Sequence, residues 1–214
     1  MFSILKESPL AARIDKVWKT KLARSKGIAT EALRSLTQGQ IPLVFFFFEE
    51  DQRQFVEFLD SKKAPYFLVT EGKGPEAIQQ KGTIFMMDAF ATASPEMIDF
   101  VSKCSQISPL AILFLGHYPL PAPENKVLEN LEQSVGSLPL VFCLSLEDAL
   151  LQTFGTDRIK PLVETLGLGD DECIEHAMVS KAIFRAREKL ETRVEHEIKT
   201  KTDAAWFARN LKPS

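Results

Sequence analysis

Five short apolar runs set the fold class of this chain, because none of them shows the polar–apolar alternation of a half-exposed strand. The strongest is Pro42 to Phe48, which reads PLVFFFF. A strand has this composition when both of its faces are covered, as in a parallel sheet between two layers of helices. Four further runs of this kind are expected as strands: Pro65–Thr70, Thr83–Asp88, Leu110–Leu115 and Leu138–Leu144.

Helix-forming segments lie between these runs. After Asp51 the apolar residues Phe55, Phe58 and Leu59 recur at three and four positions, which is helical spacing. Strands that alternate with helices predict a doubly wound α/β domain with a parallel sheet of about five strands. We place this domain at residues 28–145. The other segments expected as helices are Thr30–Leu36, Pro95–Cys104 and Asn125–Leu131.

Residues 1–27 are predicted to form a separate basic, amphipathic helix. Ser8 and Pro9 suit the start of a helix, and Gly27 suits its end. Two interpretations of this helix are open. It packs on the domain with a solvated charged face, or it lies on anionic lipid with Trp18 at the interface. The apolar residues that fall near one face are Ile14, Val17, Trp18 and Leu22.

Residues 146–214 are expected to be a helical extension. Short helices at Leu146–Phe154 and Arg158–Leu166 are interrupted by Gly155 and Gly167. From Ile174 to the end of the chain a long charged helix is predicted, with sparse apolar positions. A helix of that length must dock on a partner, pair with a second copy of itself, or stand in solvent.

Composition excludes several classes of function. The formal net charge of -3 gives no general attraction to nucleic acid. The three cysteines show no CxxC spacing and are odd in number, which argues against a disulfide framework and suits the reducing cytoplasm. The start of the chain has no apolar core of signal-peptide length, and its longest apolar run is too short to span a bilayer. We therefore expect a cytoplasmic protein, with peripheral contact to the inner membrane as a further option.

The segment Phe142 to Ile159 (FCLSLEDALLQTFGTDRI) resembles the stretch that leaves the second nucleotide-binding lobe of the SecA preprotein translocase ATPase family. The similarity continues through Leu166–Leu168 and Ile174–Ile183 (IEHAMVSKAI), and Arg185–Arg193 is similar to the start of the family's helical scaffold. Upstream, Gly39–Val44 resembles the first strand of that lobe. The resemblance implies a RecA-like domain followed by the beginning of the scaffold.

The nucleotide motifs of that family are missing. Where its glycine-rich loop contacts nucleotide, this chain has Met87–Ser94, which contains neither glycine nor arginine. Ungapped alignment from Phe142 places Leu128, Asn130 and Gln133 where the family has arginines that stabilise charge on the transferred phosphoryl group. The chain also contains no GxxxxGK[ST] phosphate loop. We therefore expect a pseudo-ATPase with no catalytic residue and no bound cofactor.

The remaining polar residues offer weak alternatives. None of the histidines His117, His176 and His196 has metal-ligand spacing with another histidine or cysteine, so no metal site is predicted. His117 follows a strand, where α/β domains often carry sites, but no nucleophile accompanies it. Asp51, Glu147 and Asp148 are expected to be helix-capping acids rather than catalysts.

The resemblance and the lost motifs together predict a non-catalytic accessory protein of secretion. Its expected partners are SecA or another secretion ATPase, a client protein, or a second copy of this chain through the C-terminal helix. Two alternatives remain open: half of a split ATPase that completes a site in trans, and a membrane-peripheral adaptor that uses the fold as a scaffold. The suspected partner-binding residues are Trp18, Glu175, His176, Val179, Ile183, Arg187 and Leu190.

Overall fold

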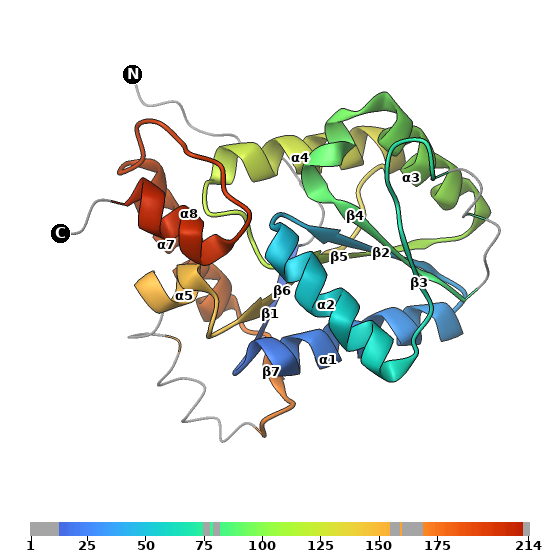
Figure 1. Ribbon diagram of the computed structural model, residues 1–214, viewed down its shortest axis with the longest axis horizontal. Helices are drawn as coiled ribbons and strands as arrows, with labels where there is room; N and C mark the ends of the chain where they lie inside the picture. The colour runs from blue at the N-terminus through green and yellow to red at the C-terminus, as the bar shows by residue number, and fades with distance from the viewer. Residues whose placement is uncertain (1–12, 75–77, 79–81, 155–158, 160–168, 212–214) are drawn as a thin grey trace.

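A computed structural model describes residues 13–74, 78, 82–154, 159 and 169–211 (Figure 1). The strands are β1 (Arg13–Trp18), β2 (Ile41–Phe46), β3 (Tyr66–Leu68), β4 (Ile84–Asp88), β5 (Leu110–Leu115), β6 (Leu140–Ser145) and β7 (Cys173–Ile174). The α-helices are α1 (Lys21–Thr37), α2 (Glu49–Lys62), α3 (Pro95–Ile107), α4 (Pro121–Val135), α5 (Ala149–Phe154), α7 (Ala177–Glu191) and α8 (Asp203–Asn210). A short 3₁₀ helix, η2, spans Ala89–Ala93.

All the strands belong to one sheet, in the order β3-β4-β2-β5-β6-β1-β7. Every pair of neighbours is parallel except β1 and β7, which are antiparallel. In the part of the chain that the structure describes, the sheet has seven strands rather than about five. The predicted class, an α/β fold built on a mainly parallel sheet, is confirmed.

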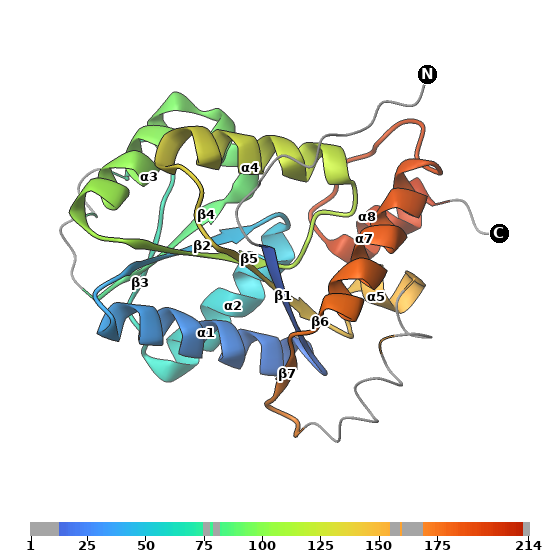
Figure 2. The same cartoon turned by 180° about the vertical axis from the view of Figure 1, so that it is seen from behind.

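Helices cover both faces of the sheet, which explains the unbroken apolar run in β2. Helices α1 and α2 lie on one face and α3 and α4 on the other (Figures 1 and 2). Leu43 and Phe45 join the core beneath α3 and α4, whereas Val44 and Phe46 join the core beneath α1 and α2. Since each face meets its own helix layer, every position of the strand has to be apolar.

The predicted N-terminal helix is wrong over its first part. Residues Arg13–Trp18 form β1, which pairs with β6 in the register Val17↔Leu144. Helix α1 begins only at Lys21, where the Thr20 side chain accepts from the N–H of Ala23 at 3.1 Å. It continues through Gly27, so the boundary drawn between residues 27 and 28 falls inside a helix. β1 gains ladder hydrogen bonds and buries Val17 and Trp18, which an isolated helix on the surface would not do.

The predicted long C-terminal helix is also wrong. Helix α7 ends at Glu191, the chain turns back, and α8 follows at Asp203–Asn210. Both helices pack on the domain at the end of the sheet that holds β6 and β1 (Figure 1). Trp206 and Leu190 are completely buried there, so the helices extend the core of the domain rather than leaving it. The helix expected at Arg158–Leu166 lies, apart from Ile159, outside the described residues.

Candidate site at the carboxyl edge of the sheet

The carboxyl ends of β2, β5 and β6 meet at one edge of the sheet, beside a change of helix layer. The chain leaves β2 for α2 on one face, but leaves the adjacent strand β5 for α4 on the opposite face (Figure 2). Adjacent strands that lead to opposite faces leave a crevice between their loops, and ligands of open α/β domains bind there. Phe48, Gly116, His117 and Asp148 line this crevice.

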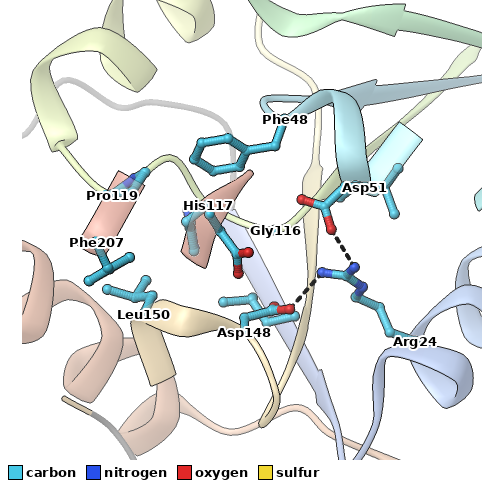
Figure 3. Close-up of a pocket in the computed structure, with 12 residues that line it drawn as sticks. Arg24, Phe48, Asp51, Gly116, His117, Pro119, Asp148, Leu150 and Phe207 are labelled. Carbon is cyan, nitrogen blue, oxygen red and sulfur yellow. Dashed lines mark hydrogen bonds and ion pairs between the residues drawn. The ribbon is translucent and has the colours of Figure 1, made fainter. Parts of the chain in front are cut away.

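The Arg24 side chain from α1 lines the crevice and pairs with two of its acids (Figure 3). One guanidinium nitrogen donates to Asp51 Oδ1 at 2.6 Å, and another donates to Asp148 Oδ1 at 2.9 Å. Asp148 Oδ2 accepts from the N–H of Ser145 at 2.7 Å. The remaining cavity has a volume of about 20 Å³, which is the space of about one water molecule. This space is much smaller than a nucleotide.

Burial governs the ionisation of this cluster, which we call the Arg24 cluster (Arg24, Asp51 and Asp148). Burial raises the pKa of Asp148 to about 6, although the charge of Arg24 opposes the rise. Burial likewise raises the pKa of Asp51 against the same opposing charge. Burial alone would lower the pKa of Arg24, but the two carboxylates raise it above its ordinary value. One permanent cation therefore holds two buried carboxylates together.

The C-terminal segment closes the crevice from outside. Phe207 and Asp203 of α8 line the cavity, and Asp203 Oδ2 accepts from the N–H of Ala149 at 2.9 Å. Lys21 at the start of α1 lies 3.6 Å from Asp203 Oδ1. The N–H of Glu50 at the start of α2 donates to the carbonyl of Lys201 at 3.2 Å. The C-terminal segment around Lys201, Asp203 and Phe207 therefore bridges the edge of the sheet at which a ligand would enter.

A second buried cluster surrounds His117, directly beside the crevice. Its Nε2 lies 2.9 Å from Asp15 Oδ1 and its Nδ1 lies 2.9 Å from Glu124 Oε2. The ring stacks on Phe142 with a centroid separation of 4.1 Å. Glu124 also pairs with Arg187 at 2.9 Å. These contacts join β1, the β5–α4 loop, α4 and α7.

The partners of His117 define its protonation state. An ionised carboxylate only accepts hydrogen bonds, so a ring flanked by two carboxylates donates from both nitrogens and carries a charge. Burial would raise the pKa of Asp15 and Glu124, but His117 and Arg187 lower both below their ordinary values. Burial and the charge of Arg187 lower the pKa of His117, whereas Glu124 and the two hydrogen bonds raise it, and the net shift is upward. The cluster therefore favours the charged form of the ring, and no nucleophile lies beside it in these contacts.

The acids predicted as caps have mixed roles. Glu147 Oε2 accepts from the N–H of Lys21 at 2.8 Å and so caps α1. Its expected role as a helix-capping acid is confirmed. Asp148 accepts from Ser145 but also binds Arg24, and Asp51 lies in the first turn of α2 with its carboxylate on Arg24. Among the described residues no cluster of His, Cys, Asp and Glu has the geometry of a metal site.

The positions that replace the lost nucleotide motifs are structurally ordinary. Leu128 packs in the core, whereas Asn130 is half-buried and Gln133 is exposed on α4. Residues Met87–Ser94 form the end of β4 and the η2 turn, which Asp88 caps by accepting from the N–H of Phe90 at 2.7 Å. One apolar side chain, two polar side chains and a capped 3₁₀ turn occupy the positions where the resemblance implies arginines and a glycine-rich loop.

Most of the suspected partner-binding residues face inward. Val179, Ile183, Arg187 and Leu190 on α7 are buried against their own domain, and Trp18 is 3% exposed beneath α1. The prediction that α7 presents these residues to a partner is corrected. They pack on core residues of their own domain, which would otherwise be exposed to solvent. Burial of Trp18 also removes the anchor of the membrane-bound helix. Of the seven residues only Glu175 and His176 are exposed, and His176 caps α7 by accepting from the N–H of Met178.

Sequence reasoning missed Arg24, Asp15 and Glu124. Arg24 lies in the basic segment 1–27, whose charges the sequence places on solvent or on anionic lipid and not in the interior of the protein. Its side chain is 2% exposed because α1 lies flat on the sheet and aims this residue over the strand ends. No spacing in the sequence connects Arg24 with Asp148, since 124 residues separate them. Only the fold brings these groups together.

The fold and the site define an open α/β domain whose ligand crevice is occupied by its own ion pairs. In sequence the chain is related to SecA. It is 28% identical over 185 residues to the protein translocase subunit SecA of Caldicellulosiruptor saccharolyticus, and 30% identical over 183 residues to that of Clostridium kluyveri. These alignments cover 84% and 83% of this chain but only 22% of each relative. The chain thus spans about a fifth of the length of these SecA proteins.

A shorter stretch is far more similar. Over 50 residues the chain is 58% identical to SecA of Clostridium tetani, which is 23% of this chain and 6% of that protein. No family model matches the chain. Among solved structures, the C-terminal part of the Fun30 ATPase domain has 10% identity and a TM-score of 0.44, with 77% of this chain and 54% of that chain covered. No described helix is long and apolar enough to cross a membrane.

Proposed function

We propose that this chain acts in protein export as a non-catalytic relative of SecA that binds a protein partner. The observation that carries the proposal is sequence similarity to SecA over 84% of the chain, combined with a crevice in which Arg24 is paired with two acids of its own domain. These ion pairs favour a role in which the domain binds a protein partner through its surface rather than a nucleotide in this crevice.

The Arg24 cluster supports the absence of nucleotide turnover. To admit a phosphate chain, the domain would have to withdraw a buried guanidinium from two buried carboxylates. Those carboxylates would then face an anionic ligand, and like charges in a buried site repel strongly. The position that the family gives to arginine holds Leu128 in the core, so no guanidinium is offered from there.

The proposed partners are a secretion ATPase such as SecA, or a client protein, met in the cytoplasm. Biolayer interferometry with purified SecA and with an unfolded client protein tests this. We expect saturable binding to at least one of the two, and no ATP turnover by the chain alone. Turnover by the chain alone, or failure to bind either protein, would contradict the proposal.

Substitution of arginine at the positions where the family has it provides a sharper test of the proposal that the chain does not hydrolyse ATP. Asn130→Arg and Gln133→Arg are placed at a half-buried and an exposed position of α4, outside the core, so the double variant should fold normally. We expect it to show no ATPase activity, because the phosphate-cradling lobe is lacking in these 214 residues and Arg24 still pairs with two acids in the crevice. Coupled phosphate-release assays against the parent protein provide the readout. Turnover that appears only in the double variant would indicate a latent nucleotide site.

A further inference from the structure

At the β3 edge of the sheet, the outward-facing backbone groups of the strand have no hydrogen-bond partner among the described residues. The carbonyl of Pro65 accepts from the N–H of Ile84 at 3.1 Å, and the N–H of Val69 donates to the carbonyl of Met86 at 2.8 Å. Alternate residues of a strand point their backbone groups to opposite sides. The N–H and C=O groups of Tyr66 and Leu68 therefore point away from β4, and β3 is the last strand on this side of the sheet among the described residues.

A groove runs beside the same strand. It has a volume of about 690 Å³, which lies within the range of pockets that bind small ligands and peptides. Val56 of α2 and the side chains of Tyr66 and Leu68 form its apolar floor. All three are half-buried, so they offer apolar surface without being part of a closed core. The groove therefore lies against the strand whose outer hydrogen bonds are unmade.

The charged rim of the groove is already paired. Arg53 donates to both carboxylate oxygens of Glu50 at 2.7 and 2.8 Å, and Lys201 pairs with Glu49 at 2.9 Å. Two acids and two bases leave the rim without net charge. A strongly charged ligand such as a phosphate or a nucleic acid has no complementary field here, whereas a neutral extended backbone does not need one.

We propose that this groove binds an extended peptide segment of a protein partner, which adds to the sheet as a strand beside β3. Backbone groups of the peptide would satisfy the outward groups of Tyr66 and Leu68, and every second side chain would enter the groove over Val56. A strand of three residues offers four outward groups. This is enough for a short peptide and too little for stable association of two whole sheets. The inference concerns a surface separate from the nucleotide crevice and holds whether or not that crevice is inert.

The probe is a set of short fluorescent peptides with alternating apolar and polar residues and net charges from negative to positive. Fluorescence anisotropy measures their binding to the whole chain. We expect one or more neutral peptides to bind. N-methylation of alternate backbone nitrogens should abolish binding in the one register that faces β3 and leave the other register intact. Binding that survives methylation in both registers, or no binding by any peptide, would overturn the proposal.

A variant pair tests the location. Val56→Glu places an unpaired charge on the groove floor and should weaken binding by about tenfold or more. Leu33→Glu is the matched control, since Leu33 is an exposed apolar residue of α1 that does not line the groove. Circular dichroism checks that both variants fold. Equal binding by the two variants would place the peptide elsewhere and refute the site.

Hydrogen exchange gives an independent readout. Bound peptide should slow exchange at the amides of Tyr66 and Leu68, because both would become hydrogen-bonded. Slow exchange at these amides without peptide, together with a dimer in light scattering, would replace the peptide by a second copy of the chain and overturn the proposal. Loss of peptide binding with retained SecA binding would refute the groove alone and leave the proposed partner function standing.

Discussion

At the residue scale, two buried ionic clusters determine how the carboxyl edge behaves. Arg24 holds Asp51 and Asp148, and His117 bridges Asp15 and Glu124. Buried ion pairs add little net stability, because desolvation offsets their attraction, but removal of one partner leaves an uncompensated buried charge. Single substitutions in these clusters therefore have larger effects than any surface charge of the chain.

Arg24→Ala should destabilise the protein by about 3–5 kcal/mol at neutral pH. The two carboxylates it leaves behind have pKa values that burial already raises, to about 6 for Asp148. Below that pH they take up protons in the folded state and the penalty shrinks, so the variant should be closer to the parent at pH 5 than at pH 7. Urea unfolding at both pH values measures this.

Arg34→Ala serves as the control for that series. Its side chain is exposed and pairs with Glu31 alone among the described residues, so the change should stay within about 0.5 kcal/mol at both pH values. An Arg24→Ala penalty no larger than that of Arg34→Ala, or one that grows toward acid, would show that the cluster is not the buried ion pair described above.

His117 should make the free energy of unfolding decrease as the pH rises above neutral. Because its pKa is raised in the folded state, its contribution is complete below the unfolded value of about 6.5 and is lost as pH rises through the folded value. His117→Gln should cost about 1–3 kcal/mol at pH 6, with a smaller gap to the parent at pH 9. Nitrogen-15 spectra of the parent should show protons on both ring nitrogens at pH 7. A singly protonated ring there would contradict the assignment.

At the element scale, strands inside the sheet were predictable and the ends of the chain were not. The run PLVFFFF predicts a strand because both helix layers impose the same demand on it. Residues Ile14, Val17 and Trp18 fit helical spacing as well as a strand, and only the free edge of β6 decides between them. Likewise, the sparse apolar positions of α7 are compatible with a partner, a second copy or solvent, and packing on its own domain is not visible in that pattern. In the structure, a single narrow row of apolar side chains on α7 covers the core beside β1.

Gly27 provides a test of how β1 and α1 fit together. Glycine lies inside α1, where alanine would normally gain about 1 kcal/mol of helix propensity. Here a Cβ at position 27 would overlap the indole ring of Trp18. Gly27→Ala should therefore destabilise by about 1–3 kcal/mol. Thermal unfolding measures it, and the double variant with Trp18→Leu should recover most of the loss. A stabilised single variant would mean that Trp18 does not pack there.

At the scale of the whole molecule, the fold class and the SecA relationship could be predicted, whereas the candidate site could not. The class follows from local patterns that repeat along the chain. The site depends on groups such as Arg24 and Asp148, which lie 124 residues apart and meet only through sheet order. The prediction that α7 residues bind a partner also depends on the fold. A sequence does not distinguish an apolar stripe that packs on its own domain from one that packs on a partner.

The central claim is that a SecA-related chain has exchanged nucleotide chemistry for partner binding. The most direct test is calorimetric titration of ATP and ADP, each with magnesium, into the purified protein. The Arg24 ion pairs in the crevice predict no binding heat up to millimolar nucleotide, and Arg24→Ala should not create binding, since it exposes two acids. Saturable binding in the micromolar range by the parent protein would contradict the claim and would make half of a split ATPase the better description.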